Sequence, residues 1–431
     1  MAATGSAVGL GNIWGFPTNA AQNGGAAFLL LYLVMTFVLA WPALMAELLI
    51  GRHTRANVVD ALRDLAPNRF FRWLGTVTGY GGLLTASLIL AFYAIIAGWI
   101  LGHWLAALLE LLGQPALAAW FVTDSIERNL LLCLIFSVIN LGIIIAGVTD
   151  GIERWSTWLM PALVIMLIAM VIYVLNQPGA MEGLRYYLIP DLERITQPGL
   201  AVSAMGQSFF ALSLGVGTML VYGSYISSDA NVPRLGTGVA LIDTSISFLA
   251  GLLIIPALFV AQAHGVATRD EAGTLIAGPD LIFQVLPQLF ASMDDGGLLM
   301  ALLFFGLLFI AALTSAISML ESPVAYTIEN TRLKRRAATW VVASLIFAVS
   351  TVIVFNFDTL FDRVVSIATE HNQPLLGMML CIFAGWLWHR HRLLEEIRKG
   401  FPDVESRLFW KIWPTYVKWV CPVLIAGVFL L

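Results

Sequence analysis

Charged residues are scarce in this sequence. Only 12% of its 431 residues are charged, whereas an average soluble protein has about 25%. Hydrophobic residues make up 59%, so too few polar side chains remain to cover a globule of this size in water. Apolar runs of about 20 residues, the length that spans roughly 30 Å of hydrocarbon, recur along the whole chain. The composition therefore excludes a soluble protein and predicts an all-α polytopic membrane protein.

Residues for enzymatic chemistry are also few. The three cysteines, Cys133, Cys381 and Cys421, stand singly within apolar segments, where a small core side chain is the expected role. The six histidines are scattered or lie in predicted loops, without the spacing of metal ligands. The sequence thus predicts a protein that is not an enzyme and has no organic cofactor or nucleic-acid partner. No feature specifies an oligomeric state.

The apolar runs predict about eleven transmembrane helices in a single transmembrane domain, residues 1–431. The segments lie near 1–21, 27–50, 75–109, 129–147, 155–176, 200–226, 236–263, 296–328, 337–355, 365–388 and 413–431. Polar stretches separate them at 177–199, 264–295 and 389–411, and the second of these could form a short hairpin of helices over the outer face. Tryptophans such as Trp99, Trp104, Trp386 and Trp388 are interpreted as anchors at the membrane interface.

The basic residues fall in alternate loops, which predicts the orientation. Clusters follow the second, eighth and tenth segments, at 52–72, 332–336 and 390–411. Because positively charged loops stay in the cytoplasm, we expect a cytoplasmic N-terminus and an external C-terminus in a cell (inner) membrane. The eleven segments and short outer loops favour a bacterial protein.

Two of the predicted segments contain glycine-rich interruptions. They read GSAVGLGN, Gly5 to Asn12, and FFALSLGVG, Phe209 to Gly217. Glycine permits non-helical backbone, which survives in a membrane only where protein or a water-lined cavity satisfies it. Breaks at matching positions of two halves indicate a binding site between inverted repeats, here about 1–176 and 200–388, with an extra helix at about 413–431. The alternative is that the glycines serve close helix packing.

The motifs at these positions resemble those of the neurotransmitter:sodium symporter family. GSAVGLGNIWGFP, Gly5 to Pro17, resembles the first-helix signature, and NGGAAF, Asn23 to Phe28, follows it. GQSFFALSLGVG, Gly206 to Gly217, and AALTSAISMLE, Ala311 to Glu321, resemble the sixth and eighth helices. GIERWS, Gly151 to Ser156, also matches, and the order agrees along nearly the whole chain. The resemblance implies a 5+5 inverted-repeat fold with broken helices 1 and 6, and sodium-coupled symport by alternating access.

The resemblance also implies two Na⁺ sites, and the hard cation suits oxygen ligands. The second of them would use Gly5, Val8, Ala311, Thr314 and Ser315. Neighbouring hydroxyls at 314 and 315 have an alternative role, because they could bond to the carbonyl four residues earlier in their own helix.

The first sodium site would use Ala7, Asn12, Ala211 and Asp243. Asp243 stands within an otherwise apolar segment, where a carboxylate is costly and usually functional. Many members of the family have asparagine there and need a chloride ion nearby. The chloride-binding neighbourhood corresponds to Tyr32, Gln207, Ala211, Asp243 and Ser247. Since Asp243 brings its own negative charge, the resemblance implies chloride-independent transport.

The implied substrate site lies between the two breaks. Its residues would be Ala7, Gly9, Leu10, Gly11, Leu90, Tyr93, Ile96, Phe210, Ala211, Ser213, Val216, Ser315 and Met319. Gly9 stands where amine transporters carry aspartate, which favours a substrate with its own carboxylate, and the wall suits a neutral, apolar amino acid. Tyr93 alone could equally be a packing or interfacial tyrosine. Glu47 would support the sixth-helix break, or would instead be a snorkelling helix end near Arg52.

The sequence departs from the family at its gates. Gly15 replaces the arginine of the outer gate, and its partner position, about Val365, lacks the aspartate. We expect Phe210 and Tyr93 to form the remaining outer gate. Only six residues precede the first break, so either residues upstream are missing or the inner gate is weakened, and Glu329 would lack its partner. These losses leave a second hypothesis open, in which the protein is a substrate-binding sensor that does not transport.

Overall fold

The structure is a computed structural model that describes residues 7–147, 154–269, 274–293 and 296–430. Within these residues the chain is almost entirely helical, with one isolated bridge between Arg269 and Leu275. Seven helical stretches are long and apolar enough to cross a membrane. They are α3–η2–α4 (Ala26–Met35, Thr36–Ala40, Trp41–Thr54), α6 (Arg69–Leu111), α8 (Ile126–Ile145), α9 (Arg154–Leu175), α13 (Val232–Ala263), α16 (Gly297–Asn330) and α17 (Arg335–Phe355).

Each of the other four predicted segments is helical but divided. These are η1–α2 (Gly11–Gly15, Phe16–Gln22), α11 and α12 (Pro198–Ala211, Thr218–Tyr225), α18–η6–α19–η7 (Phe357–Val365, Ser366–Asn372, Gln373–Ile382, Phe383–Leu387) and α21–η9–α22 (Leu408–Thr415, Tyr416–Val420, Cys421–Val428). The prediction of an all-α membrane fold is confirmed. The number of eleven crossings stays a prediction, because only the seven stretches above are both long and apolar enough to cross a membrane among the described residues.

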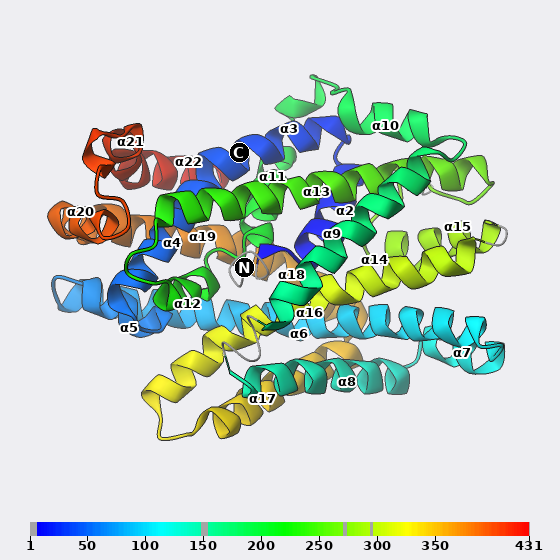
Figure 1. Ribbon diagram of the computed structural model, residues 1–431, viewed down its shortest axis with the longest axis horizontal. Coiled ribbons are helices and arrows are strands. Elements are labelled where there is room, and N and C mark those ends of the chain that lie inside the picture. Colours follow the sequence, from blue (N-terminus) through cyan, green and yellow to red (C-terminus); the bar gives the residue numbers. More distant parts are fainter. Residues whose placement is uncertain (1–6, 148–153, 270–273, 294–295, 431) are drawn as a thin grey trace.

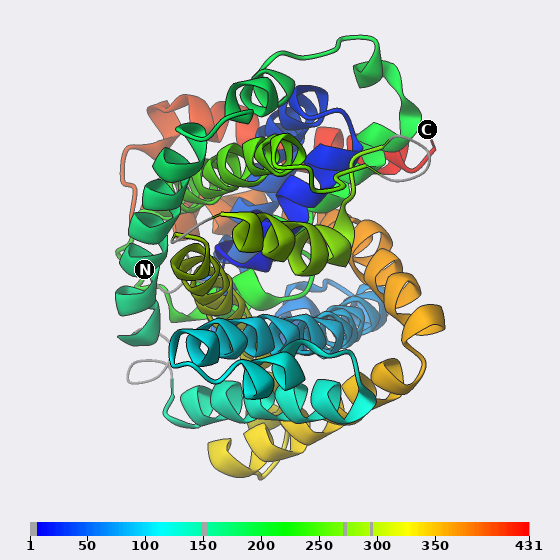
Figure 2. The same cartoon turned by 90° about the vertical axis from the view of Figure 1, so that its right-hand side faces the viewer.

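Most long helices run roughly along one direction, with short helices at both ends (Figure 1). One end carries α5 (Val58–Leu65), α12 and α20 (Arg390–Arg398), and the other carries α7 (Pro115–Val122), α10 (Ala180–Leu188) and α15 (Leu286–Ser292). The end with α5 and α20 is the one predicted to be cytoplasmic. In a view turned by 90°, the dark-blue N-terminal helices lie in the middle of the bundle (Figure 2).

The prediction of a helical hairpin within residues 264–295 is wrong. The described part of this stretch forms the Arg269–Leu275 bridge and then one helical run, α14 (Gly278–Asp280), η5 (Leu281–Val285) and α15. Pro287 stands in the first turn of α15, directly after the π-helical turn η5.

Helices α4 and α12 interlock through glycine. A Cβ atom on Gly51 of α4 would lie 1.9 Å from the carbonyl oxygen of Leu220, and one on Gly223 of α12 would lie 2.6 Å from that of Leu48. Two backbones can approach this closely only where side chains are absent. The second half of the broken sixth segment is thereby fixed against α4.

A buried ion pair ties α4 to α20. Arg52 Nε lies 2.7 Å from Glu396 Oε1, and both side chains are at most 1% exposed. The Arg52 guanidinium also donates to the carbonyl oxygen of Ala230, at 2.6 Å, and Lys399 Nζ lies 2.7 Å from Glu396 Oε2. Burial alone would raise the pKa of the Glu396 carboxyl, but the basic groups around it lower that pKa from 4.5 to about 2. Arg52 therefore pairs with a residue of α20 and not with Glu47.

Substitution of Glu396 by glutamine is expected to remove pH-dependent stability. A folded-state pKa near 2 against 4.5 in the unfolded chain gives on the order of 3 kcal/mol, present above pH 4.5 and lost as the pH falls toward 2. Thermal unfolding in detergent between pH 7 and pH 3 should therefore show a large deficit for E396Q at pH 7 that shrinks on acidification. E395Q, at an exposed neighbour, is the control, and equal curves for the two variants would contradict the role of Glu396.

Candidate functional site

The first interruption lies in the middle of the bundle. Val8 and Gly9 are non-helical, and the helical residues resume at Leu10. The Gly9 amide donates to Asn12 Oδ1 at 2.9 Å, so a side chain replaces part of the missing helical ladder. A Cβ atom on Gly9 would lie 1.8 Å from Ser315 Oγ of α16, so only glycine fits between the two segments. The predicted break is present, although Gly5 lies outside the described residues.

The second interruption separates α11 from α12. Residues 212–217 are non-helical, and Ser213, Gly215 and Gly217 have positive φ angles of 53°, 78° and 76°. The freed Gly215 amide donates to Glu47 Oε1 at 2.7 Å. Glu47 is fully buried, so its position matches the predicted support of the break and does not match a snorkelling helix end.

Oxygen atoms converge where the first interruption meets α16. Thr314 Oγ1 lies 3.2 Å from the carbonyl oxygen of Val8 and 3.1 Å from that of Ala311, and Ser315 Oγ lies 3.5 Å from the same Val8 oxygen. Thr314 Oγ1 also lies 3.2 Å from the carbonyl oxygen of Ile310, which is the bond that the alternative role of this hydroxyl requires. The Thr314 hydroxyl therefore takes part both in the oxygen cluster and in a hydrogen bond within its own helix. Four of the five residues predicted for the second sodium site are close together.

A second polar cluster surrounds Asp243 of α13. Asn12 Nδ2 donates to Asp243 Oδ1 at 2.7 Å and to Ser247 Oγ at 2.9 Å. The Tyr32 hydroxyl lies 3.4 Å from Asp243 Oδ2 and 3.1 Å from Ser247 Oγ. All four side chains are fully buried. Among the other predicted ligands, Ala7 and Ala211 are buried beside the two interruptions, with exposures of 1% and 2%.

Gln207 of α11 hydrogen-bonds to the first segment, next to Asn12. Its Nε2 atom donates to the carbonyl oxygen of Gly11 at 2.6 Å, and its Oε1 atom accepts from Asn19 Nδ2 at 3.1 Å. Of the five residues of the chloride-binding neighbourhood, the hydrogen bonds connect Tyr32, Asp243 and Ser247. Gln207 instead fills the space beside Gly15, where a Cβ atom would lie 3.1 Å from its Oε1.

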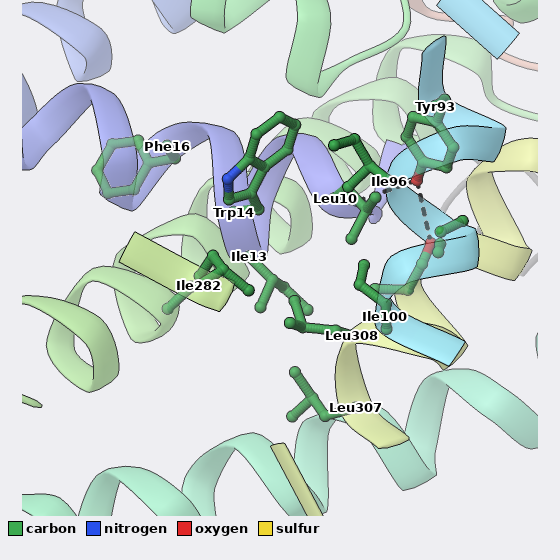
Figure 3. Close-up of a cluster of buried hydrophobic side chains, with 14 of the residues drawn as sticks. Leu10, Ile13, Trp14, Phe16, Tyr93, Ile96, Ile100, Ile282, Leu307 and Leu308 are labelled. Carbon is green, nitrogen blue, oxygen red and sulfur yellow. Dashed lines mark hydrogen bonds between the residues drawn. The ribbon is translucent and has the colours of Figure 1, made fainter. Parts of the chain in front are cut away.

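Tyr93 lies against the first interruption. Its hydroxyl accepts from the Leu10 amide at 3.1 Å and lies 3.5 Å from the carbonyl oxygen of Ala311 (Figure 3). Tyr93 is 1% exposed, so it is not an interfacial tyrosine. Phe210 packs on Gly11, where a Cβ atom would lie 3.2 Å from its ring. The remaining predicted wall residues are also buried: Leu90, Ile96, Ser213, Val216 and Met319.

The family of this chain follows from a match to a protein-family model. The model of the sodium:neurotransmitter symporter family matches residues 1–126 and 121–431, which together cover the chain. The chain belongs to this family. The prediction of the family is confirmed, and so is the prediction that the protein is a multi-pass transporter and not an enzyme.

Several relatives align over the full length of this symporter. An uncharacterized sodium-dependent transporter of Bacillus subtilis is 33% identical, covering 100% of this chain and 95% of its own. Another from Haemophilus influenzae is also 33% identical, with the same coverage. The rat sodium- and chloride-dependent GABA transporter 2 is 26% identical over 67% of this chain and 54% of its own. The bacterial relatives support the predicted bacterial source.

A solved structure confirms the predicted symporter fold. The crystal structure of MhsT in complex with L-phenylalanine matches with a TM-score of 0.87 and 36% sequence identity. The match covers 100% of this chain and 96% of that one. The predicted class, an all-α fold with broken helices 1 and 6, is thus confirmed.

The two altered outer-gate positions of this symporter face one cavity. Gly15 and Val365 both line a space of about 190 Å³, together with Phe210. Asn19 donates to Gln207 Oε1 at 3.1 Å and accepts from Ser203 Oγ at 3.0 Å, and all three side chains line the same cavity. Loss of both charges leaves no unpaired buried charge behind.

The inner end contains polar contacts that the sequence did not predict. Glu329 accepts from Asn57 Nδ2 at 2.6 Å and from the Asn57 amide at 2.9 Å, so a neutral side chain bonds to it, and among the described residues no cation pairs with it. Glu321 is paired with Arg335, at 3.1 Å between Oε1 and Nη1, and accepts from the Tyr225 hydroxyl at 2.8 Å. Arg335 is one of four basic residues at 332–336, so the sequence did not single it out as the partner.

Proposed function

We propose that this protein is a sodium-coupled symporter of a neutral, apolar amino acid that works without chloride. Family membership supports sodium-coupled transport, and the observation that carries the rest is the position of Asp243. Its carboxylate sits 2.7 Å from the side chain of Asn12, directly beside the first interruption. A buried negative charge at this point suits a cation whose remaining ligands are uncharged oxygens.

Two groups of oxygens support two sodium ions. One ion would lie among Ala7, Asn12, Ala211 and Asp243, with the Asn12 amide turned so that its oxygen faces the cation. The other would lie among the carbonyl oxygens of Val8 and Ala311 and the hydroxyls of Thr314 and Ser315, with Gly5 completing the set. Oxygen atoms 3.1 to 3.5 Å apart, as found around Thr314, are spaced as the ligands of one small cation would be.

The substrate would lie between the two interruptions with its carboxylate at the first. The Gly11 amide, the Leu10 amide that donates to Tyr93 in this structure, and the Tyr93 hydroxyl would be donors for a carboxylate at the start of a helix. The ammonium group would be held by oxygens of Ala7, Phe210, Ala211 and Ser213. MhsT was solved with L-phenylalanine, and the apolar wall formed by Leu90, Ile96, Val216 and Met319 supports a side chain of the same class.

Chloride independence follows from the charge of Asp243. In this proposal the carboxylate, joined to Tyr32 and Ser247, supplies the negative charge that a chloride ion would bring. Ala211 adds to the argument, since it has no hydroxyl to offer an anion. The rat relative is named as chloride-dependent, so the two chains are expected to differ in this respect.

The decisive experiment is uptake into proteoliposomes. Purified protein should accumulate radiolabelled phenylalanine or leucine when a sodium gradient points inward, and not when potassium replaces sodium. Uptake should be unchanged when gluconate replaces chloride on both sides. Uptake that requires chloride would overturn the chloride proposal, and a preference for a charged amino acid would overturn the substrate class.

The alternative is a sensor that binds the amino acid without transporting it. The altered outer gate, where Gly15 and Val365 face one cavity, is the observation in its favour. A sensor would show sodium-dependent stabilisation by the amino acid in thermal unfolding, and no accumulation in the same proteoliposomes. Both assays on one preparation separate the two functions.

Substitution of Tyr93 by phenylalanine should weaken substrate binding while sodium binding persists. The variant keeps the ring but removes a donor to the carboxylate, and hydrogen bonds to charged groups contribute about 1.5–3 kcal/mol. The KM for the amino acid should therefore rise about 10- to 100-fold, with sodium-induced thermal stabilisation unchanged. Tyr173→Phe, at a distant tyrosine of α9, is the control, and an unchanged KM in Y93F would remove Tyr93 from the site.

A further inference from the structure

A pocket rich in tryptophan and basic residues lies near α20, away from the site described above. Its volume is about 370 Å³, and it lies between η7 and η9, which are neighbouring parts of the tenth and eleventh segments. The residues that line it include Trp386, Trp388, Arg390, Lys418 and Trp419, and none of the aspartates and glutamates that the structure describes. The pocket therefore presents positive charge at the end of the molecule predicted to be cytoplasmic.

The two cations of this pocket lie against aromatic rings. Lys418 Nζ lies 4.6 Å from the ring centre of Trp386 and 5.8 Å from that of Trp419. The Arg390 guanidinium lies 5.2 Å from the ring centre of Trp410. In the part of the chain that the structure describes, neither forms a salt bridge. Aromatic rings hold these charges in place but leave them uncompensated.

Trp388 adds an unused donor. Its indole Nε1 is buried and has no hydrogen-bond acceptor among the described residues, and the side chain is 4% exposed. A buried donor without an acceptor is unusual and costs about 1–3 kcal/mol. Trp388 lines the pocket together with Arg390 and Lys418, so an anion with several acceptor oxygens is the class of ligand that suits all three. Trp388 was predicted to be an interfacial anchor, but its ring packs 4.7 Å from that of His53 and is buried.

The backbone around the pocket has an irregular form on both sides. The segments η7 and η9 are both π-helical, and such turns occur frequently at functional sites. They are in close contact, since a Cβ atom on Gly385 would lie 2.6 Å from Lys418 Cα. Trp386 Nε1 donates to the carbonyl oxygen of Lys418 at 2.7 Å, which fixes the tryptophan beside the cation.

We propose that this pocket binds the phosphate of an anionic phospholipid. Two uncompensated cations and a free indole N–H match the oxygens of a phosphodiester. Basic pockets between transmembrane helices on the cytoplasmic side suit anionic headgroups. Trp386 and Trp419 are about half exposed, at 47% and 52%, as expected for tryptophans at the membrane interface, so the ligand would come from the bilayer.

Native mass spectrometry of lipid adducts tests the proposal. Delipidated protein is titrated with phosphatidylglycerol or with phosphatidylcholine, whose headgroup has no net charge. The full-length protein should bind phosphatidylglycerol at least ten-fold more tightly, and K418Q and R390Q should each lose about ten-fold or more of that affinity. K411Q removes one positive charge from an exposed site outside the pocket and should lose about five-fold at most. Equal losses in K418Q and K411Q, or no preference for phosphatidylglycerol, would overturn the proposal.

A second variant removes the donor and keeps the charge. W388F lacks the indole N–H, so lipid affinity should fall about ten-fold while the thermal stability of lipid-free protein stays unchanged or rises. Inorganic phosphate forms the last arm of the test. If phosphate stabilises lipid-free protein as strongly as phosphatidylglycerol does at equal concentration, the ligand is a soluble anion and the lipid assignment is wrong.

Discussion

Substitution of Asp243 by asparagine is expected to abolish sodium-driven uptake in the absence of chloride. The fully buried carboxylate is joined to Asn12 and Tyr32, so its loss leaves a bound cation without a counter-charge. Breaking a buried charge pair costs about 3–5 kcal/mol, which corresponds to a sodium affinity lowered at least 100-fold. Thermal unfolding across a sodium titration, beside uptake in gluconate, measures both effects.

The counterpart of this prediction is a gain of chloride dependence. The double variant D243N/A211S replaces the fixed charge with an amide and supplies the hydroxyl that Ala211 lacks. Uptake by this variant should recover partly when chloride is added and should stay absent in gluconate. D280N, the same substitution at an exposed position of α14, serves as the control. Full activity of D243N without chloride would show that Asp243 is not the counter-charge.

The second large effect is expected from substitution of Gly9 by alanine. The added methyl group would lie 1.8 Å from Ser315 Oγ and 2.6 Å from Ser315 Cβ, so the first interruption and α16 must move apart. A displacement of about 1 Å at a reacting or binding centre can cost about 100-fold in rate. Uptake should therefore fall below about 1% of the wild-type rate, and sodium should no longer stabilise the protein.

Matched variants separate this local effect from general damage. G142A adds the same methyl group on α8, where nothing lies within 4 Å, and should transport normally. In G9A/S315G the obstructing side chain is removed, so thermal stability should return toward that of S315G alone. Transport should stay low because the Ser315 hydroxyl is missing. If G9A transports at the wild-type rate, the close packing at Gly9 is not needed for function.

The fold and the centre of the site could be predicted because local sequence specifies them. Glycine at positions 9, 215 and 217 permits the two interruptions, and a lone aspartate in an apolar helix marks a functional position. Asn12, Asp243 and the hydroxyls at 314 and 315 then meet near these interruptions, as the motifs imply. The roles of these residues as ligands stay predictions.

Contacts between distant segments could not be predicted. Arg52 and Glu396 are separated by 344 positions, and nothing near Arg52 in the sequence indicates that its partner lies on α20. Glu329 bonds to Asn57, and nothing in the sequence sets Asn57 apart from the other polar residues of the predicted loops. The π-helical segments that shape the lipid pocket likewise depend on packing between helices and have no residue pattern of their own.

The interlocking of Gly51 and Gly223 has a consequence for motion. Because the backbones of α4 and α12 touch, neither helix can slide past the other without a clash, and Glu47 adds a hydrogen bond at the end of the contact. The two helices should thus travel as one rigid body. Spin labels on this pair should keep a constant separation with sodium, potassium or amino acid present, whereas a label on α12 should shift relative to one on α17.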